Sequence, residues 1–386
     1  MSRTRTSLGL RLAFIFQLLL LVDTAGAISR KAALGRELFF DTDLSSPSGQ
    51  SCASCHEPIL FFTDPDTRIS TSEGVLPGRF GNRNAPTLMY SSATPPFHFD
   101  QGEGLFVGGQ FHDGRASTLK DQAKQPFLNA LEMNNGSPAE VVEKVRAAPY
   151  AGLFKRVFGK KSLENPAKAF DLIGEAIAAF EKTAQFSPMS SKYDYYLQGK
   201  VRLTAQELRG RVVYEAEDKG NCAACHPSRP DQNGAKRPLF TDFTYDNLGV
   251  PRNPDSRFYA QASDFNPSGF KFVDNGLGEN VGDPAENGKF KVPTLRNIAK
   301  TAPYMHNGYF KTLRGVIDFY NSRDVKPVCP SEWVTEEEAL RQACWPAPEV
   351  ASNVNHDELG KLGLSEQEVV DLEAFLLTLT DGYKLK

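Results

Sequence analysis

Two copies of the motif C-x-x-C-H constrain this chain more than any other feature of its 386 residues. The first copy, CASCH, spans 52–56, and the second, CAACH, spans 222–226. In this motif two thiols attach covalently to the vinyl groups of a c-type haem, and the next histidine ligates the iron. The alternatives are a chance match or a redox dithiol beside an unrelated histidine, and either would have to occur twice in one chain. We therefore expect two haem c groups, attached at Cys52 and Cys55 and at Cys222 and Cys225, with His56 and His226 as iron ligands.

Residues 1–27 have the features of a secretory signal peptide. Three arginines in the first 11 residues form a positive region, and residues 12–22 form an apolar segment. Residues 25–27, Ala-Gly-Ala, are the small residues typical of a cleavage site. We expect export, with cleavage near Ala27; an uncleaved membrane anchor is the alternative. The apolar run is short for a membrane span, and no later segment is as apolar. The mature chain is therefore expected to have no membrane span.

The charge of the chain argues against nucleic acid as a partner. Lysine and arginine number 44 and aspartate and glutamate 47, which gives a formal net charge of −3 at pH 7. Binding to nucleic acid or to an anionic membrane surface calls for clustered positive charge, which is absent here. A mildly acidic protein remains compatible with a basic protein partner.

The sequence around the two motifs indicates an internal repeat built from helices. GRELFF at 35–40 precedes the first motif, and GRVVY at 210–214 precedes the second. Thr204 and Glu207 are spaced as a capping box that opens the second of these helices. Each half also ends in an amphipathic segment, at 170–182 and at 365–380, and Ser365 and Glu368 form a capping box for the latter. Two similar helical units in tandem are therefore expected.

Between the predicted helices the chain is rich in Gly, Pro, Asn and Asp, as in NPDSRFYAQASDFNPSG, which predicts loops. The sequence shows no coherent strand pattern. We predict a mainly α fold of two tandem cytochrome c-type haem domains with long loops. The N-terminal domain is expected at 28–190 and the C-terminal domain at 191–386, with the boundary near Ser187 to Lys200.

The second axial position of each iron decides the chemistry. A protein ligand there favours electron transfer, whereas an open position allows peroxide or oxygen to bind. A dihaem electron carrier would need both positions filled. The tyrosine of GVIDFYNS, Tyr320, shares a helical stripe with Leu313, Val316 and Ile317, and periodicity alone predicts a core tyrosine.

The chain resembles the bacterial dihaem cytochrome c peroxidases, and within them the MauG-like branch, over nearly the whole mature sequence. The most specific stretches are LGRELFFDTDLS, GNRNAPTLMY, GGQFHDGRASTLKDQAKQPFLNALEMNN, FSPMSSKYDYYLQG, FKVPTLRNIAKTAPYMHNGYF and VIDFYN. The resemblance implies a periplasmic haem-dependent oxidoreductase that uses hydrogen peroxide to oxidise a side chain, tryptophan in the first instance, of a partner protein. A detoxifying peroxidase that takes electrons from a small cytochrome is the alternative enzyme.

The resemblance also implies the roles of particular residues. His56 would be the proximal ligand of the peroxide-reactive N-terminal haem, and His226 and Tyr320 would ligate the C-terminal haem. Ordinary family members have methionine where Tyr320 stands. Methionine sulfur is soft and raises the reduction potential, whereas tyrosinate is hard and anionic and stabilises oxidised iron. A His/Tyr haem is therefore suited to holding an oxidising equivalent rather than to relaying electrons.

Three residues match the distal side of the N-terminal haem in the family. Glu132 would transfer a proton between the peroxide oxygens, Gln122 would shape the pocket, and Pro126 would line it. Composition alone would make Glu132 a solvated helix residue. Ordinary family members also have a histidine before the RNAPT motif that blocks the iron. No histidine lies between Glu57 and Phe97, which favours an open site.

Two departures from the family pattern concern electron transfer. His112 follows GGQF where the family usually has an inter-haem tryptophan, and imidazole is harder to oxidise than indole. A core histidine bonded to a propionate or a backbone carbonyl is the other interpretation of His112. Residues 217–221 contain no aromatic residue where MauG-like relatives have a surface tryptophan. The tryptophans of this chain, Trp333 and Trp345, are expected to be packing residues, with an electron path as the alternative.

Two further sites are expected from chemistry and from the family. Trp333 and Trp345 lie in or beside the segment bounded by Cys329 and Cys344, which should form a disulfide in an oxidising compartment, free thiols being the alternative. The resemblance also implies one Ca²⁺, which the hard oxygen atoms of protein and water would coordinate. Its expected ligands are the side chain of Asn84 and the carbonyls of Thr301 and Pro303.

Overall fold

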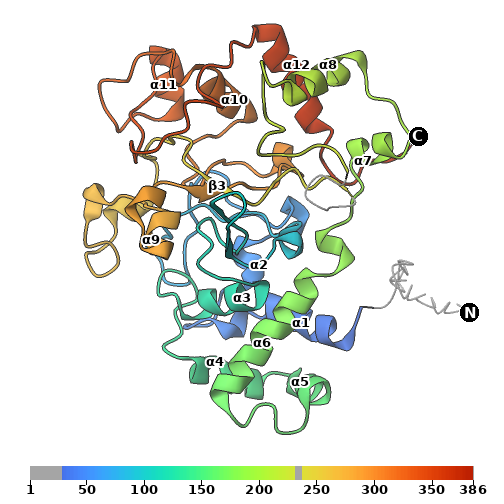
Figure 1. Cartoon of the computed structure of the whole chain (residues 1–386). Helices are drawn as coiled ribbons and strands as arrows, with labels where there is room; N and C mark the ends of the chain where they lie inside the picture. The colour runs from blue at the N-terminus through green and yellow to red at the C-terminus, as the bar shows by residue number, and fades with distance from the viewer. Residues whose placement is uncertain (1–27, 231–236, 386) are drawn as a thin grey trace, which may run out of the picture.

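The computed structural model is helix-rich, with one group of helices in each half of the chain (Figure 1). It describes residues 28–230 and 237–385, so the predicted signal peptide lies outside the described residues. The helices of the N-terminal half are α1 (Arg30–Phe40), α2 (Cys52–Cys55), α3 (Leu119–Leu128), α4 (Pro138–Ala147), α5 (Ala151–Phe158) and α6 (Pro166–Glu181). Those of the C-terminal half are α7 (Lys192–Leu197), α8 (Ala205–Glu215), α9 (Leu277–Val281), α10 (Leu313–Ser322), α11 (Glu336–Gln342) and α12 (Glu366–Leu377).

The crossing of α1 and α6 organises the N-terminal group. Gly35 stands at the crossing, where a Cβ atom would overlap the carbonyl oxygen of Ala176. The backbones can approach this closely because glycine has no side chain. Beside it the rings of Phe39 and Phe180 meet edge to face at 5.4 Å. The helix α6 begins earlier than the predicted 170–182, because Asn165 caps it and Pro166 occupies its first turn.

The crossing of α8 and α12 repeats this arrangement in the C-terminal group. A Cβ atom on Gly210 would overlap the carbonyl oxygen of Asp371, and Tyr214 meets Phe375 edge to face at 5.1 Å. Both predicted capping boxes are present, one at Thr204 and Glu207 and the other at Ser365 and Glu368. The equivalent positions of Gly35 and Gly210 account for the repeated Gly-Arg in the two sequences.

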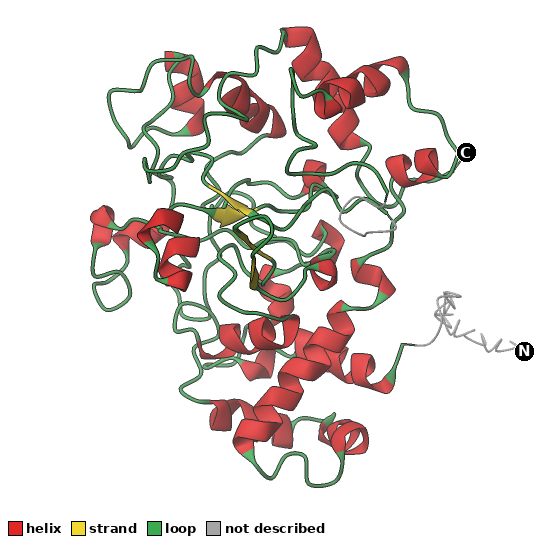
Figure 2. Cartoon of the chain, in the orientation of Figure 1, coloured by secondary structure: helices red, strands yellow, loops and turns green. Residues whose placement is uncertain are grey.

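Two small antiparallel sheets lie between the helix groups (Figure 2). The strands are β1 (His98–Asp100) paired with β2 (Leu105–Val107), and β3 (Tyr245–Asp246) paired with β4 (Phe290–Lys291). The sequence analysis found no strand pattern at these places, although the fold remains mainly helical. Strands of two or three residues are too short to show the alternation by which a strand is recognised in sequence.

The buried side chains form separate clusters in the two halves. Phe186 belongs to the cluster around α1 and α6, and Tyr193 belongs to the cluster around α8 and α12. The packing thus changes between these residues, inside the predicted boundary region, where α7 forms a short helix. The domain limits themselves stay a prediction. No helix within 28–230 or 237–385 is long and apolar enough to cross a membrane.

The glycine at the second crossing gives a test of the fold. We expect Gly210→Ala to destabilise the haem-loaded protein by about 1–3 kcal/mol, because the added methyl group must push α8 away from α12. Gly152 is the matched control: it is exposed on α5, where a Cβ atom would meet only Arg156 Nη1 at 3.4 Å. Gly152→Ala should be neutral or stabilise by up to about 1 kcal/mol, since alanine favours helix. Urea unfolding followed by circular dichroism measures both; equal midpoints for the two variants would contradict the crossing.

Candidate functional site

Two large cavities contain the predicted haem-binding residues, one in each half. The N-terminal cavity is lined by part of the first motif and by all three predicted distal residues: Cys55, His56, Gln122, Pro126 and Glu132. The C-terminal cavity is lined by the second motif and by the predicted tyrosine ligand: Cys222, Cys225, His226 and Tyr320. The structure thus brings together residues that the sequence analysis placed together, although their roles stay predictions.

Both motif histidines are held in a form that can ligate a metal. His56 Nδ1 lies 3.0 Å from the carbonyl oxygen of Phe62, and His226 Nδ1 lies 2.8 Å from that of Phe240. A carbonyl only accepts, so Nδ1 is the donor and Nε2 keeps the lone pair that binds iron. Burial lowers the pKa of His56 and of His226 to about 4, so both imidazoles are neutral near pH 7.

The two accepting carbonyls belong to residues with an unusual backbone. Phe62 has φ of 56° and Phe240 has φ of 55°, in the left-handed region that bulky residues rarely adopt. Such a conformation persists where the surrounding structure imposes it, and it is often found at functional sites. Here it occurs at the same place in both halves, next to the histidine that each carbonyl orients.

The cavities fit a covalently attached haem on three counts. The four motif cysteines are free thiols in the structure. The exposed lining of both cavities is mostly apolar, as the faces of a porphyrin require. Cationic side chains complete the walls: Arg83 and Arg115 line the N-terminal cavity and Lys291 lines both cavities, where they could pair with haem propionates.

The distal wall of the N-terminal cavity comes largely from α3 and the turn after it. Gln122 and Pro126 lie one helical turn apart on α3, so both face the same side. Glu132 follows the helix, and Asn129 Nδ2 donates to Glu132 Oε1 at 2.7 Å. Burial raises the pKa of Glu132, so its carboxyl stays protonated up to a higher pH than an exposed glutamate does. A positioned carboxyl of this kind can take a proton and return it.

Tyr320 lies on the predicted stripe of α10, which begins after the cap Thr312. Leu313, Val316, Ile317 and Tyr320 all line the C-terminal cavity, so this face of the helix borders the cavity as well as the core. Burial raises the pKa of the Tyr320 phenol in the polypeptide alone. The phenol therefore keeps its proton unless a cation binds its oxygen, and a ligating iron would lower the pKa of the phenol in this way.

His112 lies between the cavities and lines both. Its Nε2 donates to the carbonyl oxygen of Asn84 at 2.9 Å. Burial lowers the pKa of His112 to about 3, so a protonated bridge is disfavoured. The interpretation as a core histidine bonded to a backbone carbonyl agrees with these contacts. An additional role in passing charge between haems stays a prediction.

A buried ionic network near the N-terminal cavity was not anticipated from sequence. Arg83 bonds Asp113 at 2.6 Å and Asp274 at 2.7 Å, and Asp113 also accepts from Arg115 at 3.0 Å. Coulomb attraction and hydrogen bonds from Arg83 outweigh burial and hold the pKa of Asp274 well below its usual range. Three of these residues could have been singled out from the sequence. Arg83, Asp113 and Arg115 lie in GNRNAPTLMY and GGQFHDGRASTL, two stretches that carry the family resemblance.

The predicted calcium ligands lie together on the wall of the C-terminal cavity. Asn84, Thr301 and Pro303 all line it, and Asn84 Nδ2 donates to the Pro303 carbonyl at 2.6 Å. If the amide is rotated by half a turn, Asn84 Oδ1 takes the place of Nδ2 beside the Pro303 carbonyl oxygen. The two oxygens could then bind one cation between them. These amide and carbonyl oxygens suit Ca²⁺, and its presence stays a prediction.

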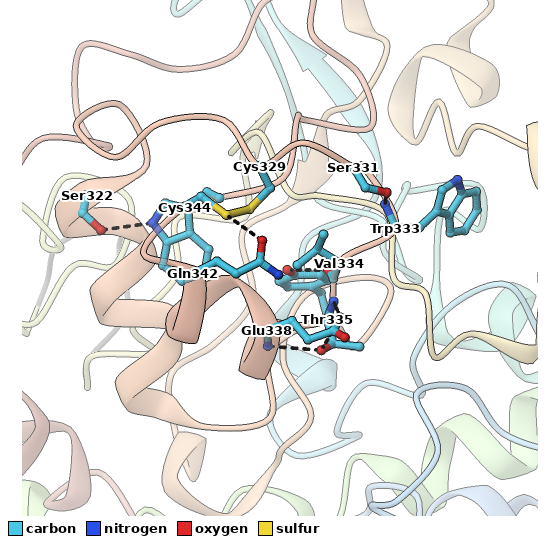
Figure 3. Close-up of a disulfide and its surroundings, with 11 residues drawn as sticks. Ser322, Cys329, Ser331, Trp333, Val334, Thr335, Glu338, Gln342 and Cys344 are labelled. Carbon is cyan, nitrogen blue, oxygen red and sulfur yellow. Dashed lines mark hydrogen bonds between the residues drawn. A yellow bond between two sulfur atoms is a disulfide. The ribbon is translucent and has the colours of Figure 1, made fainter.

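The predicted disulfide between Cys329 and Cys344 is confirmed, with Cα atoms 5.1 Å apart (Figure 3). Trp345 follows it and is only 2% exposed, packed against Phe310 and Phe319. Trp345 is therefore a packing residue, as expected. Trp333 differs, because it is partly exposed, and Figure 3 shows its indole well apart from the disulfide.

Comparison with known proteins places these features in a family context. A family model described as di-haem cytochrome c peroxidase matches residues 29–202. The methylamine utilization protein MauG of Paracoccus denitrificans is 42% identical over 386 residues, covering 96% of each chain. The cytochrome c551 peroxidase of Nitrosomonas europaea is 36% identical over 290 residues, covering 74% of this chain and 71% of its own.

Two solved structures share the fold over most of their length. A tyrosine-to-methionine variant of the diheme peroxidase BthA from Burkholderia thailandensis superposes with a TM-score of 0.78 at 34% identity, covering 92% of this chain and 86% of that one. A MauG-like protein associated with microbial copper homeostasis gives a TM-score of 0.67 at 31% identity, covering 96% of both chains.

Proposed function

This chain belongs to the dihaem cytochrome c peroxidase family, on its MauG-like branch, and from that premise we propose that it uses hydrogen peroxide to oxidise a side chain of a partner protein. It is a haem-dependent oxidoreductase, and membership of the family implies two haem c groups. The proposal adds that the oxidised side chain is a tryptophan. It also adds that the protein works in the periplasm as two tandem haem domains, at 28–190 and 191–386.

The observation that favours this function is the position of Tyr320. Its side chain lines the same cavity as His226 and the second motif, on a helix face that also lines the cavity at Leu313, Val316 and Ile317. A phenolate ligand at this cavity would stabilise the oxidised iron and disfavour relay from a small cytochrome. The 42% identity to MauG over the whole chain supports the same choice.

The residues of the N-terminal cavity would handle the peroxide protons. Bound haem supplies an iron that accepts the oxidising equivalents of hydrogen peroxide. His56 would hold that iron from one side, oriented by the Phe62 carbonyl. Glu132 would take a proton from one peroxide oxygen and give it to the other, held in place by Asn129. Gln122 and Pro126 would restrict what else enters the cavity.

A cytochrome c peroxidase function is the runner-up, because the cytochrome c551 peroxidase is 36% identical over 290 residues. The two functions differ in the electron donor. In one, a partner side chain loses electrons and is permanently changed. In the other, a reduced small cytochrome is the donor and is merely reoxidised.

A competition experiment separates them. The haem-loaded protein is given hydrogen peroxide together with reduced small cytochrome c and with candidate partners, the products of neighbouring genes. We expect tryptophan oxidation in one partner, mapped by mass spectrometry, to proceed while the cytochrome stays largely reduced. Rapid cytochrome oxidation with no modified partner would contradict the proposal and favour the runner-up. If the haem spectrum does not change when peroxide is added, both enzyme functions are excluded and a dihaem electron carrier is the remaining function.

A further inference from the structure

A surface cluster of three aromatic residues, Tyr259, Phe270 and Trp333, lies near the C-terminal cavity; we call it the aromatic patch. The ring of Trp333 stands edge-on to Tyr259 at 4.9 Å and to Phe270 at 5.6 Å. Phe270 is 62% exposed and Trp333 is partly exposed, whereas Tyr259 is buried beneath them. Aromatic residues left in contact with solvent are enriched where proteins bind other proteins.

Glu349 connects the aromatic patch to the cavity. Its side chain is only 4% exposed to solvent and lines the C-terminal cavity. The Tyr259 hydroxyl lies 3.5 Å from Glu349 Oε1, a long hydrogen bond in which the phenol donates. A continuous series of contacts therefore runs from the cavity wall through Glu349 and Tyr259 to Trp333 at the surface.

The charges around the patch suit a transient positive charge on the indole. Arg252 lies 5.7 Å from the Trp333 ring, but it is shared between two carboxylates, Glu332 at 3.6 Å and Glu349 at 3.8 Å. Two negative charges thus face one positive charge. Burial, with the Glu349 carboxylate next, raises the pKa of Tyr259, so the phenol keeps its proton unless it is oxidised.

We propose that Tyr259 and Trp333 form the route by which electrons of the partner protein reach the C-terminal cavity, with Trp333 as the surface contact. The proposal rests on the proposed function and adds the place at which the partner is oxidised. It also offers an answer to the absence of any aromatic residue at 217–221, just before the second motif.

Tyr259 would give one electron to the peroxide-oxidised haem that the C-terminal cavity holds, and its O–H bond breaks as the proton passes to Glu349 Oε1. Trp333 then gives one electron to the tyrosyl radical, which recovers its proton from Glu349. The partner gives one electron to the oxidised Trp333. Two such passages remove two electrons from the partner side chain, which also releases two protons. Together the two electrons and two protons reduce one hydrogen peroxide to two waters.

Trp345 is the competing candidate and is less suitable. It packs against Phe319, whose ring lies 6.3 Å from that of Tyr320. However, it is 2% exposed, and Lys326 lies over its ring at 4.8 Å. A lysine cation opposes positive charge on the indole, and a buried ring offers no contact to a partner.

The test uses the haem-loaded protein without a partner, so that oxidation accumulates on the route itself. After hydrogen peroxide is added, we expect peptide mapping to find oxidised tryptophan at Trp333 and very little at Trp345. In Tyr259→Phe the phenol can no longer release a proton to Glu349, and Trp333 oxidation should fall roughly tenfold or more. Tyr309→Phe is the matched control, because this phenol is also buried but donates to the Val334 carbonyl, at 3.0 Å, instead of to Glu349, and the change should leave Trp333 oxidation unchanged.

A spectroscopic readout separates the route from the overall reaction. Freeze-quenched samples should give an electron paramagnetic resonance signal that narrows when tryptophan, rather than tyrosine, is ring-deuterated, and that is lost in Trp333→Phe. Oxidation spread over Trp345 or other residues, with Trp333 unmodified, would overturn the route and leave the proposed function standing. Failure of peroxide to react at all would overturn both.

Discussion

Tyr320→Met is expected to raise the reduction potential of the C-terminal haem by roughly 0.2–0.4 V, part of the ~0.8 V range over which axial ligands act. A neutral thioether stabilises reduced iron where an anionic phenolate stabilises oxidised iron. The same change should move the enzyme towards the runner-up function, so that a reduced small cytochrome becomes an effective donor and partner oxidation falls. Spectroelectrochemical titration of the holoenzyme measures the potential directly.

Two further variants separate ligation from packing. Tyr320→Phe keeps the ring and removes the oxygen, so it should open the axial position of the C-terminal haem. The haem spectrum should then change, but not to the spectrum of a methionine-ligated haem. Tyr304→Met is the matched control, because Tyr304 lines the same cavity while its hydroxyl donates to the Ile298 carbonyl at 2.8 Å. Tyr304→Met should change the reduction potential of the C-terminal haem by only a small fraction of the change expected for Tyr320→Met. If Tyr320→Met and Tyr320→Phe both leave the spectrum and potential unchanged, Tyr320 is a packing residue.

What the sequence could predict depended on whether the signal was local. The C-x-x-C-H motif is contiguous, so the attachment residues could be recognised without knowing the fold. The capping boxes at Thr204 and Ser365 span only four residues each, and both are present. Periodicity placed Tyr320 on the correct face of α10, but whether that face bordered a core or a cavity depends on the distant residues that complete the wall.

The unpredicted features join residues that are far apart in the chain. Arg83 reaches Asp113 across 30 residues and Asp274 across 191. Glu349 and Tyr259 are separated by 90, and nothing in either local sequence links them. The disulfide was predictable because it needed only two cysteines left over from the haem motifs and an oxidising compartment. The small sheets were not, because their strands are shorter than one full alternation.

Glu132→Gln is expected to slow the reaction of the holoenzyme with hydrogen peroxide by roughly 10²–10⁴-fold, the usual contribution of a positioned acid–base group. The amide is close in shape to the carboxyl, and its oxygen can still accept from Asn129 Nδ2, so the pocket should be preserved. What is lost is the ability to take a proton from one peroxide oxygen and deliver it to the other. Stopped-flow absorbance after mixing with peroxide gives the rate.

The matched control is Glu181→Gln, which alters a buried carboxyl elsewhere in the N-terminal half. Glu181 is 2% exposed, lies at the end of α6, and is absent from the wall of the cavity that Glu132 lines. Burial raises the pKa of Glu181 to about 8, so it is already mostly neutral near pH 7 and the substitution changes little charge. Its peroxide reaction should match that of the unmodified protein. Equal peroxide reaction rates in the two variants would show that Glu132 does not take part in the proton transfer. A slower reaction in Glu132→Gln alone, with unchanged haem reduction potentials, would assign the proton transfer to the Glu132 carboxyl.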